Sequence, residues 1–416
     1  MSQDPTARTI EASYFQNRLL EWYHRNKRSM PWRDDPTAYH VWISEIMLQQ
    51  TRVDAVRNYY LRFIERLPDI QSLADVDDDE LHKLWEGLGY YNRAKNLKKT
   101  AQLLIREYDG ELPSTFDELL KLHGIGPYTA GAVASIAFRQ AVPAVDGNVM
   151  RVISRLTGDV RDIMQQSTRK AMEEVVRDLI PPDEVHHFNQ ALMELGALVC
   201  IPNGSPKCTN CPVNNICYAY ETGAQNTLPV KKEKKKRVIR HRSILVFVNE
   251  KNEFLIQKRG ETGLLSGLWE FVSVEGEIST HDLKLLLKQK GLSFRSVTKI
   301  EDAKHIFSHI EWRMHGYLIK ASYTGPFTSS ADVVYPYEID LSKESLVIRE
   351  SEGSLLPDLS FRPEQVWCNF DTMKKTYGIP TAFKAYLTSI EKGLIKDELD
   401  RADQKLPTDE RRRKKG

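Results

Sequence analysis

The stretch LLKLHGIGPYTAGAVASIAF, residues 119–138, decides the fold of the first half of the chain. A helical pattern ends at Gly124-Ile125-Gly126, and a second helical pattern, rich in Ala and Gly, follows it. The two glycines allow a tight turn and leave backbone N–H groups free to bind an anion at the start of the second helix. A Gly-x-Gly alone is more often a turn that ends a helix. The motif therefore predicts a helical hairpin first and a phosphate contact second.

The sequence on both sides of this hairpin is helical up to about residue 225. Apolar residues recur at spacings of three and four, as in Val53, Val56, Tyr60 and Ile64. Pro and Gly residues separate these stretches into helices joined by short loops. Residues 1–225 are therefore expected to form a mainly α domain.

The sequence pattern changes from helical to β-rich after a basic segment. Residues 231–242, KKEKKKRVIRHR, carry eight Lys or Arg against one Glu, and residues 226–241 are interpreted as a solvated linker, with phosphate contact as the alternative. Short β-rich runs follow: SILVFV (243–248), FLIQKR (254–259), LWEFVSV (268–274) and HIFSHIEWRMHGYLI (305–319). We expect an α+β domain over residues 242–392.

Two helices are expected within this second domain. Residues 280–290, THDLKLLLKQK, have Thr280 at the N-cap position and Gly291 just past the end. Residues 381–392, TAFKAYLTSIEK, form the second pattern. The charged stretch over 393–416 has too few apolar residues to pack and is expected to be disordered.

Composition bounds the class of protein. The 416 residues are 41% hydrophobic and 28% charged with a net charge of +2, which is typical of globular domains and does not by itself indicate a nucleic-acid partner. No apolar run approaches the roughly eighteen residues of a membrane span, and the N-terminus lacks the pattern of a signal peptide. We expect a cytoplasmic, intracellular protein that is not secreted and has no membrane partner.

Four of the five cysteines, Cys200, Cys208, Cys211 and Cys217, lie within eighteen residues with the spacing C-x7-C-x2-C-x5-C. Disulfides are not expected in a reducing compartment, so this cluster predicts a shared metal. Four thiolates suit either a zinc ion or a [4Fe-4S] cluster. Zinc sites usually combine two C-x2-C pairs and this chain has one, which favours iron-sulfur and leaves zinc open. Cys368 is expected to be a buried packing residue.

Two carboxylates are candidates for chemistry. Glu45 lies in VWISEIMLQQT (41–51), where apolar neighbours would raise its pKa and keep it protonated as a general acid. The alternative is a salt bridge with Arg52 or Arg33. Asp146 lies in PAVDGNVMRV (143–152) at the expected start of a helix, and a structural N-cap explains it equally well.

Several motifs, taken in order, resemble the helix-hairpin-helix DNA glycosylase superfamily and, within it, the adenine DNA glycosylase (MutY) family. The resemblance covers roughly residues 15–220 and rests on SEIMLQQT (44–51), GLGYYNRAKNL (87–97), the hairpin, VDGNVMRV (145–152) and the four cysteines. It implies base excision repair and a [4Fe-4S] cluster. The family usually has six residues between the first two cysteines, and IPNGSPK (201–207) here has seven, which leaves the shape of that loop open.

The resemblance also implies roles for individual residues. Glu45 matches the general acid that protonates adenine, and Asp146 matches the carboxylate that stabilises an oxocarbenium-like sugar. Tyr128 and Asn148 match residues that hold this site. Relatives that also cut the strand carry a lysine where this chain has Tyr128, so the resemblance implies a monofunctional glycosylase. The residues implied to contact DNA are Trp32, Arg33, Gln50, Thr51, Tyr90, Gly124, Ile125 and Gly126.

Residues from 241 to about 390 resemble the family's C-terminal domain, which is similar to the Nudix hydrolase fold. The acidic run of a Nudix box is absent near Gly267, so phosphohydrolysis is not expected. Phe307-Ser308-His309 matches the loop that recognises 8-oxoguanine in the family, although the residues alone would predict an ordinary strand. The implied partner is duplex DNA with adenine opposite 8-oxoguanine or guanine, bound by a monomer.

Three alternatives remain at this level. An endonuclease III-like enzyme acting on oxidised pyrimidines shares the hairpin, the aspartate and the cysteines, but Tyr128, Glu45 and the second domain argue against it. A nucleotide-pool hydrolase would use the C-terminal domain with magnesium. A protein that only marks lesions would bind the same DNA and leave the adenine in place.

Overall fold

The computed structural model describes residues 10–232, 237–322, 359 and 361–393. The chain divides into two compact units, Met1–Asp78 with Tyr91–Lys234 and Asp79–Tyr90 with Lys235–Gly416. The sequence did not predict that Asp79–Tyr90 belongs with the second unit, and the predicted boundaries at residues 225, 242 and 392 stay predictions. The predicted tail and part of the predicted linker lie outside the described residues.

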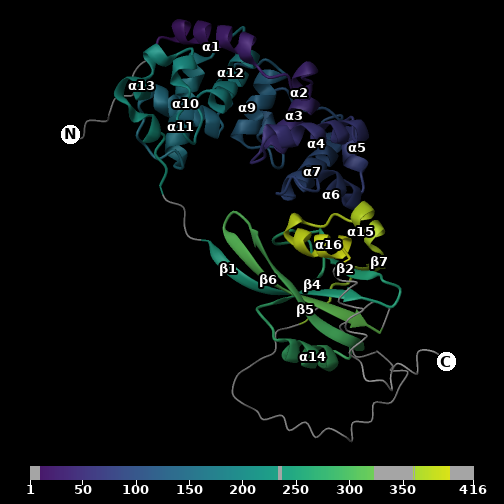
Figure 1. The fold of residues 1–416 in the computed structure, drawn as a ribbon. Coiled ribbons are helices and arrows are strands. Elements are labelled where there is room, and N and C mark those ends of the chain that lie inside the picture. The colour runs from purple at the N-terminus through teal and green to yellow at the C-terminus, as the bar shows by residue number, and fades with distance from the viewer. Residues whose placement is uncertain (1–9, 233–236, 323–358, 360, 394–416) are drawn as a thin grey trace, which may run out of the picture. The chain divides into compact units, whose positions relative to one another are not determined.

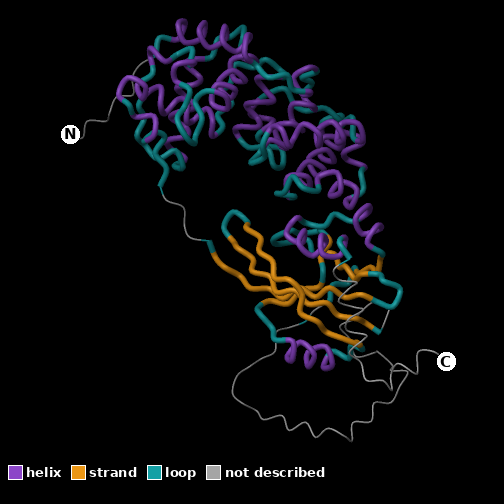
Figure 2. The backbone as a smooth tube through the Cα atoms, viewed as in Figure 1, coloured by secondary structure: helices purple, strands orange, loops and turns teal. Residues whose placement is uncertain are grey.

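The first unit is helical, as predicted (Figures 1 and 2). Its helices are α1 Ala12–Asn26, α2 Pro31–Asp34, α3 Ala38–Leu48, α4 Val53–Arg66, α5 Ile70–Asp75, α7 Asn92–Glu107, α8 Phe116–Leu119, α9 Pro127–Ile136, α10 Gly147–Thr157, α11 Gln166–Leu179, α12 Val185–Leu198 and α13 Tyr218–Thr222. Short 3-10 turns at Cys208–Asn210, Asn214–Ile216 and Ala224–Asn226 form the segment around the cysteines. Helix α6, Asp78–Trp85, begins at the boundary between the units.

Apolar faces of α1, α10, α11 and α12 build one core of the first unit. Phe15 and Leu19 of α1 pack with Val149 and Ile153 of α10 and with Phe188 of α12, all essentially buried. Helix α9 approaches the backbone before α10 closely, since a Cβ on Gly131 would lie 2.1 Å from the carbonyl oxygen of Pro143. This packing fixes the segment that leads into Asp146.

The predicted hairpin is present between α8 and α9. Gly124 has φ +73°, a left-handed conformation that favours glycine, and a Cβ there would lie 2.8 Å from the Cβ of Asn96. Gly126 is the N-cap of α9 and Pro127 is its first residue, where a proline costs no hydrogen bond. Ile125 is buried, so its side chain packs inside the unit.

The second unit is an α+β domain built on one sheet, as predicted. Its elements are β1 Val238–Val248, β2 Phe254–Lys258, β3 Trp269–Glu270, β4 Val272–Glu275, α14 Thr280–Gln289, β5 Phe294–Ile306, β6 Ile310–Ala321, β7 Gln365–Cys368, α15 Phe370–Thr376 and α16 Lys384–Glu391, with a 3-10 turn at Thr381–Phe383. The main strand order is β3-β2-β1-β6-β5, with β4 paired to β1 and β7 to β2. Strands β1 and β6 are parallel, and the other pairs are antiparallel.

Helices cover both faces of this sheet (Figure 1). On one face, Leu283 and Leu287 of α14 pack against Phe247. On the other face, Phe383 and Tyr386, at the start and within α16, pack against Phe271. Cys368 is buried in this second layer, as expected.

Three details differ from the sequence predictions. The N-cap of α14 is Ser279, whose hydroxyl accepts from the backbone N–H of Asp282, because Thr280 already has helical geometry. The run at 305–319 was predicted as strand throughout, but it divides into β5 and β6. The short elements β7 and α15 were not predicted.

Within the described residues, no helix is both long and apolar enough to cross a membrane.

Candidate active site

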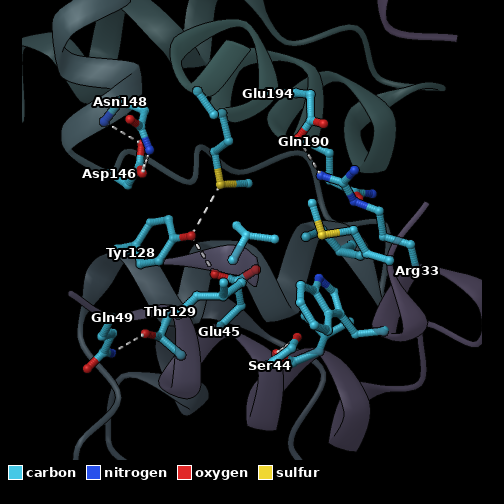
Figure 3. Close-up of a pocket in the computed structure, with 18 of the residues that line it drawn as sticks. Arg33, Ser44, Glu45, Gln49, Tyr128, Thr129, Asp146, Asn148, Gln190 and Glu194 are labelled. Carbon is cyan, nitrogen blue, oxygen red and sulfur yellow. Dashed lines mark hydrogen bonds and ion pairs between the residues drawn. The ribbon is translucent and has the colours of Figure 1, made fainter. Parts of the chain in front are cut away.

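One cavity of about 840 Å³ in the first unit collects the predicted catalytic residues and most of the predicted DNA contacts (Figure 3). It opens between α2, α3, the start of α9, the start of α10 and α12. The predicted residues that line it are Trp32, Arg33, Glu45, Gln50, Thr51, Gly126, Tyr128, Asp146 and Asn148. They come from four separate stretches of the sequence, and the helical fold brings them to one place.

Glu45 lies on α3, and its side chain is buried at 6% exposure. The hydroxyl of Tyr128 donates a hydrogen bond to its carboxylate and also contacts the Met193 sulfur at 3.2 Å. The pKa of Glu45 is raised to about 7, mainly by burial and also by the charge of Asp146, while the Tyr128 hydrogen bond and Arg33 act to lower it. The site therefore contains a carboxyl group that exchanges a proton near neutral pH.

Arg33 does not take the salt bridge with Glu45 that the sequence left open. Its Nη2 donates instead to Oε2 of Glu194 at 3.0 Å, and Arg28 donates from Nε to Oε1 of the same carboxylate at 2.7 Å. Burial alone would raise the pKa of Glu194, but the hydrogen bonds from Arg28 and Arg33 and the charge of Arg33 lower it. Arg28 and Glu194 were missed by the sequence reasoning, because an ion pair across 166 residues leaves no local pattern.

Asp146 is the N-cap of α10. Its Oδ1 accepts from the backbone N–H groups of Asn148 and Val149 at 2.9 and 2.8 Å, and its Oδ2 accepts from the Asn148 side chain at 2.7 Å. Burial raises the pKa of Asp146, whereas these hydrogen bonds and the charge of Arg151 lower it. The structural interpretation of Asp146 is correct, and it leaves the carboxylate lining the same cavity as Glu45.

Two arginines of α10 connect this cavity to the cysteine segment. Arg151 donates to Oδ1 of Asn148 at 2.9 Å and to the backbone carbonyl of Cys200 at 2.7 Å. One turn later, Arg155 donates to the Cys200 sulfur at 3.3 Å and to the carbonyl of Leu228 at 2.9 Å. The helix that starts at Asp146 therefore also holds the loop that carries the first cysteine.

The four cysteines line one small cavity together with residues such as Val199 and Pro206. A zinc ion with Zn–S bonds of about 2.3 Å would hold its sulfurs roughly 3.8 Å apart. In the described chain, the ligand groups with all donor atoms within 4.8 Å of one another are two histidine-carboxylate groups, and the cysteines form no such group. Their wider spacing suits a larger cluster better than a single ion.

Burial also bears on what the cysteines can bind. It raises the pKa of the Cys211 thiol to about 12 and raises the pKa of the Cys208 and Cys217 thiols as well. Thiolates in such a place need positive charge beside them. Metal ions would provide that charge, so the donor set fits a metal cluster.

The predicted DNA contacts near the cavity differ in exposure. Trp32 is mostly buried, edge-on to Tyr60 at 5.3 Å, so most of its surface serves the core. Gln50 is exposed and has φ +58°. Arg93, which the sequence reasoning missed, donates to the carbonyls of Ile46, Met47 and Gln49 at 2.7, 3.0 and 2.7 Å, and to the Thr51 hydroxyl at 3.4 Å.

The remaining predicted residues lie in the second unit. Phe307, Ser308 and His309 form the tight turn between β5 and β6, so the expectation of an ordinary strand is wrong. Phe307 packs on Trp312 with ring centroids 4.9 Å apart, while Ser308 and His309 are exposed. The Tyr90 hydroxyl, in the Asp79–Tyr90 segment of this unit, lies 2.9 Å from the Ser308 hydroxyl.

Models of known protein families match parts of both units. Residues 43–180 match the HhH-GPD superfamily of base excision DNA repair proteins, and residues 243–389 match the NUDIX domain. The helical fold, the hairpin and the cavity lined by Glu45 and Asp146 thus belong to an enzyme of the base excision repair class.

Within that class, the chain belongs to the adenine DNA glycosylase family. The adenine DNA glycosylase of Buchnera aphidicola subsp. Schizaphis graminum is 35% identical over 326 residues, which cover 78% of this chain and 93% of that protein. The mouse adenine DNA glycosylase is 34% identical over 358 residues, 72% of this chain and 69% of that protein. The structure of a thermostable thymine-DNA glycosylase is 30% identical, with a TM-score of 0.47 over 51% of this chain and 97% of that one.

The raised pKa of Glu45 predicts a pH-dependent effect on stability. The folded pKa of about 7 lies above the ordinary 4.5, so folding favours the protonated form, and this contribution is lost as pH rises from 4.5 through 7. The Glu45→Gln variant does not titrate. Its stability relative to wild type should rise by about 3 kcal/mol between pH 4.5 and pH 8, measured by urea unfolding. A difference that is constant with pH would contradict the raised pKa.

Proposed function

We propose that the protein hydrolyses the N-glycosidic bond of adenine in duplex DNA where adenine faces 8-oxoguanine or guanine, without cutting the strand. The observation that carries the proposal is the buried Glu45 carboxyl, hydrogen-bonded by Tyr128 and titrating near neutral pH, in a cavity that Asp146 also lines. A base inside a duplex is out of reach of such a cavity, so the adenine must be flipped out of the stack.

Glu45 acts as the general acid. It donates its proton to N7 of the flipped adenine, so that the base leaves as a neutral species rather than as an anion. Burial keeps the proton on Glu45 until the base arrives, because it disfavours the charged form. Glu194 supports this role by pairing with Arg33, whose charge lowers the pKa of Glu45.

Asp146 stabilises the positive charge that develops on the sugar as the bond breaks, before water adds. Its fixed position comes from three donors, two backbone N–H groups and the Asn148 amide, and Arg151 in turn holds Asn148. Tyr128 orients Glu45 from the position where strand-cutting relatives have a lysine. Since a phenol cannot form a Schiff base, excision ends at the abasic site.

The Glu45→Gln variant tests the general acid. Because glutamine keeps the size of the side chain and lacks the acidic proton, single-turnover release of adenine opposite 8-oxoguanine should fall by about 10²–10⁴-fold while duplex binding persists. Wild-type turnover, read after alkali cleavage of the abasic site, should decline as pH rises above about 7. Unchanged turnover in the variant would refute the role of Glu45. Binding by wild type without release would refute the activity itself.

We also propose that Cys200, Cys208, Cys211 and Cys217 hold a [4Fe-4S] cluster. The proposal is supported by their shared cavity, by an arrangement looser than the four ligands of one zinc ion and by burial that leaves the thiolates in need of positive charge. The four cysteines would hold the cluster, and the shared ligand would cross-link the segment from Cys200 to Cys217. Arg155, which donates to the Cys200 sulfur, would stabilise the negative charge of the thiolates.

The metal content of the purified protein distinguishes a [4Fe-4S] cluster from a zinc ion directly. Purified protein should contain iron and acid-labile sulfide in equal amounts and absorb visible light, because thiolate-to-iron charge transfer colours such clusters. Cys208→Ser should lose iron, whereas Cys368→Ser, which changes a buried cysteine of the other unit, should retain it. Stoichiometric zinc in place of iron would overturn the proposal.

Recognition of the base opposite adenine is assigned to the second unit. Ser308 and His309 are exposed on a tight turn, and their hydroxyl and imidazole offer the donors and acceptors that distinguish 8-oxoguanine from guanine at N7 and C8. The Tyr90 hydroxyl supports the turn through Ser308. Gln50, Thr51 and the Gly124–Gly126 turn serve as further DNA contacts, and the protein acts as a monomer.

Replacing Ser308 and His309 together by alanine should reduce discrimination between the two opposite bases. The variant should excise adenine opposite 8-oxoguanine and opposite guanine at more similar rates, because the polar groups that read the lesion are removed, while the chemistry of Glu45 is untouched. Single-turnover rates on the two duplexes measure the ratio. An unaltered ratio would exclude the turn as the reader.

A further inference from the structure

Four ionisable side chains meet at one place on the sheet of the second unit: His241 on β1, Glu277 between β4 and α14, Asp302 on β5 and His315 on β6. Nδ1 of His241 lies 3.2 Å from Nε2 of His315, and Oε2 of Glu277 lies 3.6 Å from that same nitrogen. Nδ1 of His315 lies 3.1 Å from Oδ2 of Asp302. Nothing in the proposed excision chemistry uses this group, which is here called the histidine cluster.

The sheet explains why these residues meet. Parallel pairing places His315 opposite Ser243, two residues after His241, and the backbone N–H of Gly276 donates to the carbonyl of His241, which brings Glu277 alongside. Strand β5 has an irregularity between Ile300 and Ala303, where it holds one residue more than β6. Such a bulge re-aims side chains, and it brings Asp302 to His315.

The spacing of the donor atoms fits a zinc ion. Ligands at about 2.0–2.1 Å around a tetrahedral ion lie roughly 3.3 Å apart. The separations of 3.2 Å between the two imidazole nitrogens and 3.6 Å between nitrogen and carboxylate are close to that value. Two histidines and one glutamate form a three-ligand set, and the exposed side of Glu277 leaves the fourth position to water.

Asp302 provides the outer contact that histidine ligands of zinc usually have. A carboxylate that accepts from one imidazole nitrogen fixes the tautomer, so that the other nitrogen offers its lone pair to the metal. His315 has this arrangement, with Nδ1 toward Asp302 and Nε2 toward His241 and Glu277. Nζ of Lys299 lies 3.9 Å from Oδ1, the other carboxylate oxygen of Asp302. Since Asp302 is shared by Lys299 and His315, Glu277 is the carboxylate that faces the ion.

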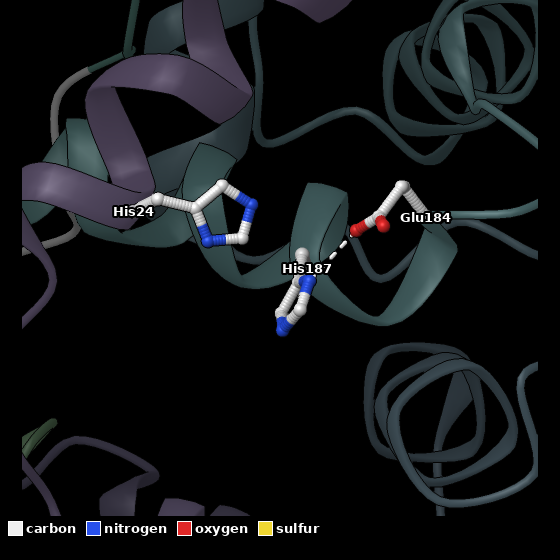
Figure 4. A group of neighbouring side chains, drawn as sticks. All are labelled: His24, Glu184 and His187. Atoms are coloured by element: carbon white, nitrogen blue, oxygen red, sulfur yellow. Dashed lines mark hydrogen bonds and ion pairs between the residues drawn. The ribbon is translucent and has the colours of Figure 1, made fainter.

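A second group of similar composition is less suited to a metal. His24, Glu184 and His187 lie together on α1 and at the start of α12 (Figure 4), and Nδ1 of His187 is 2.7 Å from Oε2 of Glu184. That distance is typical of a hydrogen bond, and it is shorter than the separation of about 3.3 Å between two ligands of one zinc ion. Lys27 adds positive charge that lowers the pKa of His24, after burial and His187. This group serves as the control.

We propose that His241, Glu277 and His315 bind one zinc ion, with Asp302 as the positioning residue behind His315. The ion joins β1, the segment after β4 and the β5–β6 hairpin. Asp302 and His315 lie in the half of this hairpin nearer its turn, Phe307–His309, so bound zinc restricts the motion of the turn. The binding itself does not depend on the proposed DNA chemistry, and its test stands if that chemistry fails.

Zinc titration of the purified full-length protein, cysteine cofactor retained, tests the proposal by calorimetry. Wild type should bind one zinc ion. His241→Ala, a change at an exposed position, should abolish this binding, and Asp302→Asn should weaken it by about 10–100-fold because the outer contact is lost. His24→Ala should bind as wild type does. Circular dichroism of each variant verifies that it is folded.

Two further readouts separate this site from others. Cobalt bound in place of zinc should show no thiolate charge transfer, and zinc should slow amide exchange across residues 305–311 in wild type but not in His241→Ala. Retained binding in folded His241→Ala, loss in His24→Ala, a cobalt-thiolate spectrum, or no binding by wild type would each overturn the proposal.

Discussion

The hydrogen bonds at the start of α10 are the interactions on which the rest of the first unit depends. Asp146 caps the helix through Oδ1, which accepts from two backbone N–H groups, while its Oδ2 accepts from the Asn148 side chain. The same helix carries Arg151 and Arg155 toward the cysteine segment. Loss of the cap would cost the helix about 1 kcal/mol locally. It would also release the one end of the helix that lines the cavity, while the other end holds the loop around Cys200.

The electrostatics of the cavity depend on which of its buried carboxylates have cationic partners. Two arginines and one glutamate form a compact ion group in which Glu194 is almost fully covered. A buried carboxylate with two cationic partners is well compensated. Removing either arginine would leave part of the Glu194 charge uncompensated in a low-dielectric environment. Glu45 lies outside this group and so experiences mainly desolvation. The two glutamates of one cavity differ because Glu194 pairs with two arginines, whereas Glu45 accepts from a neutral tyrosine hydroxyl and its pKa is set mainly by burial.

Local sequence patterns predicted the elements of the site and missed the contacts between them. The apolar neighbours of Glu45, the N-cap position of Asp146 and the turn at Gly124 are properties of short segments, so periodicity and capping rules were sufficient. Glu194 with Arg33, Arg93 with the end of α3, and the histidine cluster join residues 44 to 161 positions apart, or meet only through sheet register and a bulge. The division of residues 305–319 into two strands also depended on pairing rather than composition.

Arg93 has a consequence for the kinetics of association. The last carbonyls of a helix lack partners within it, and Arg93 supplies them for α3, immediately before Gln50 takes a left-handed conformation. Gln50 is thus held in a backbone geometry that a free chain adopts rarely. The entropy of ordering it is lost when the protein folds and not when it meets a ligand. Such pre-organisation lengthens residence times more than it speeds encounter, so loosening this residue would shorten the lifetime of a complex before it slowed its formation.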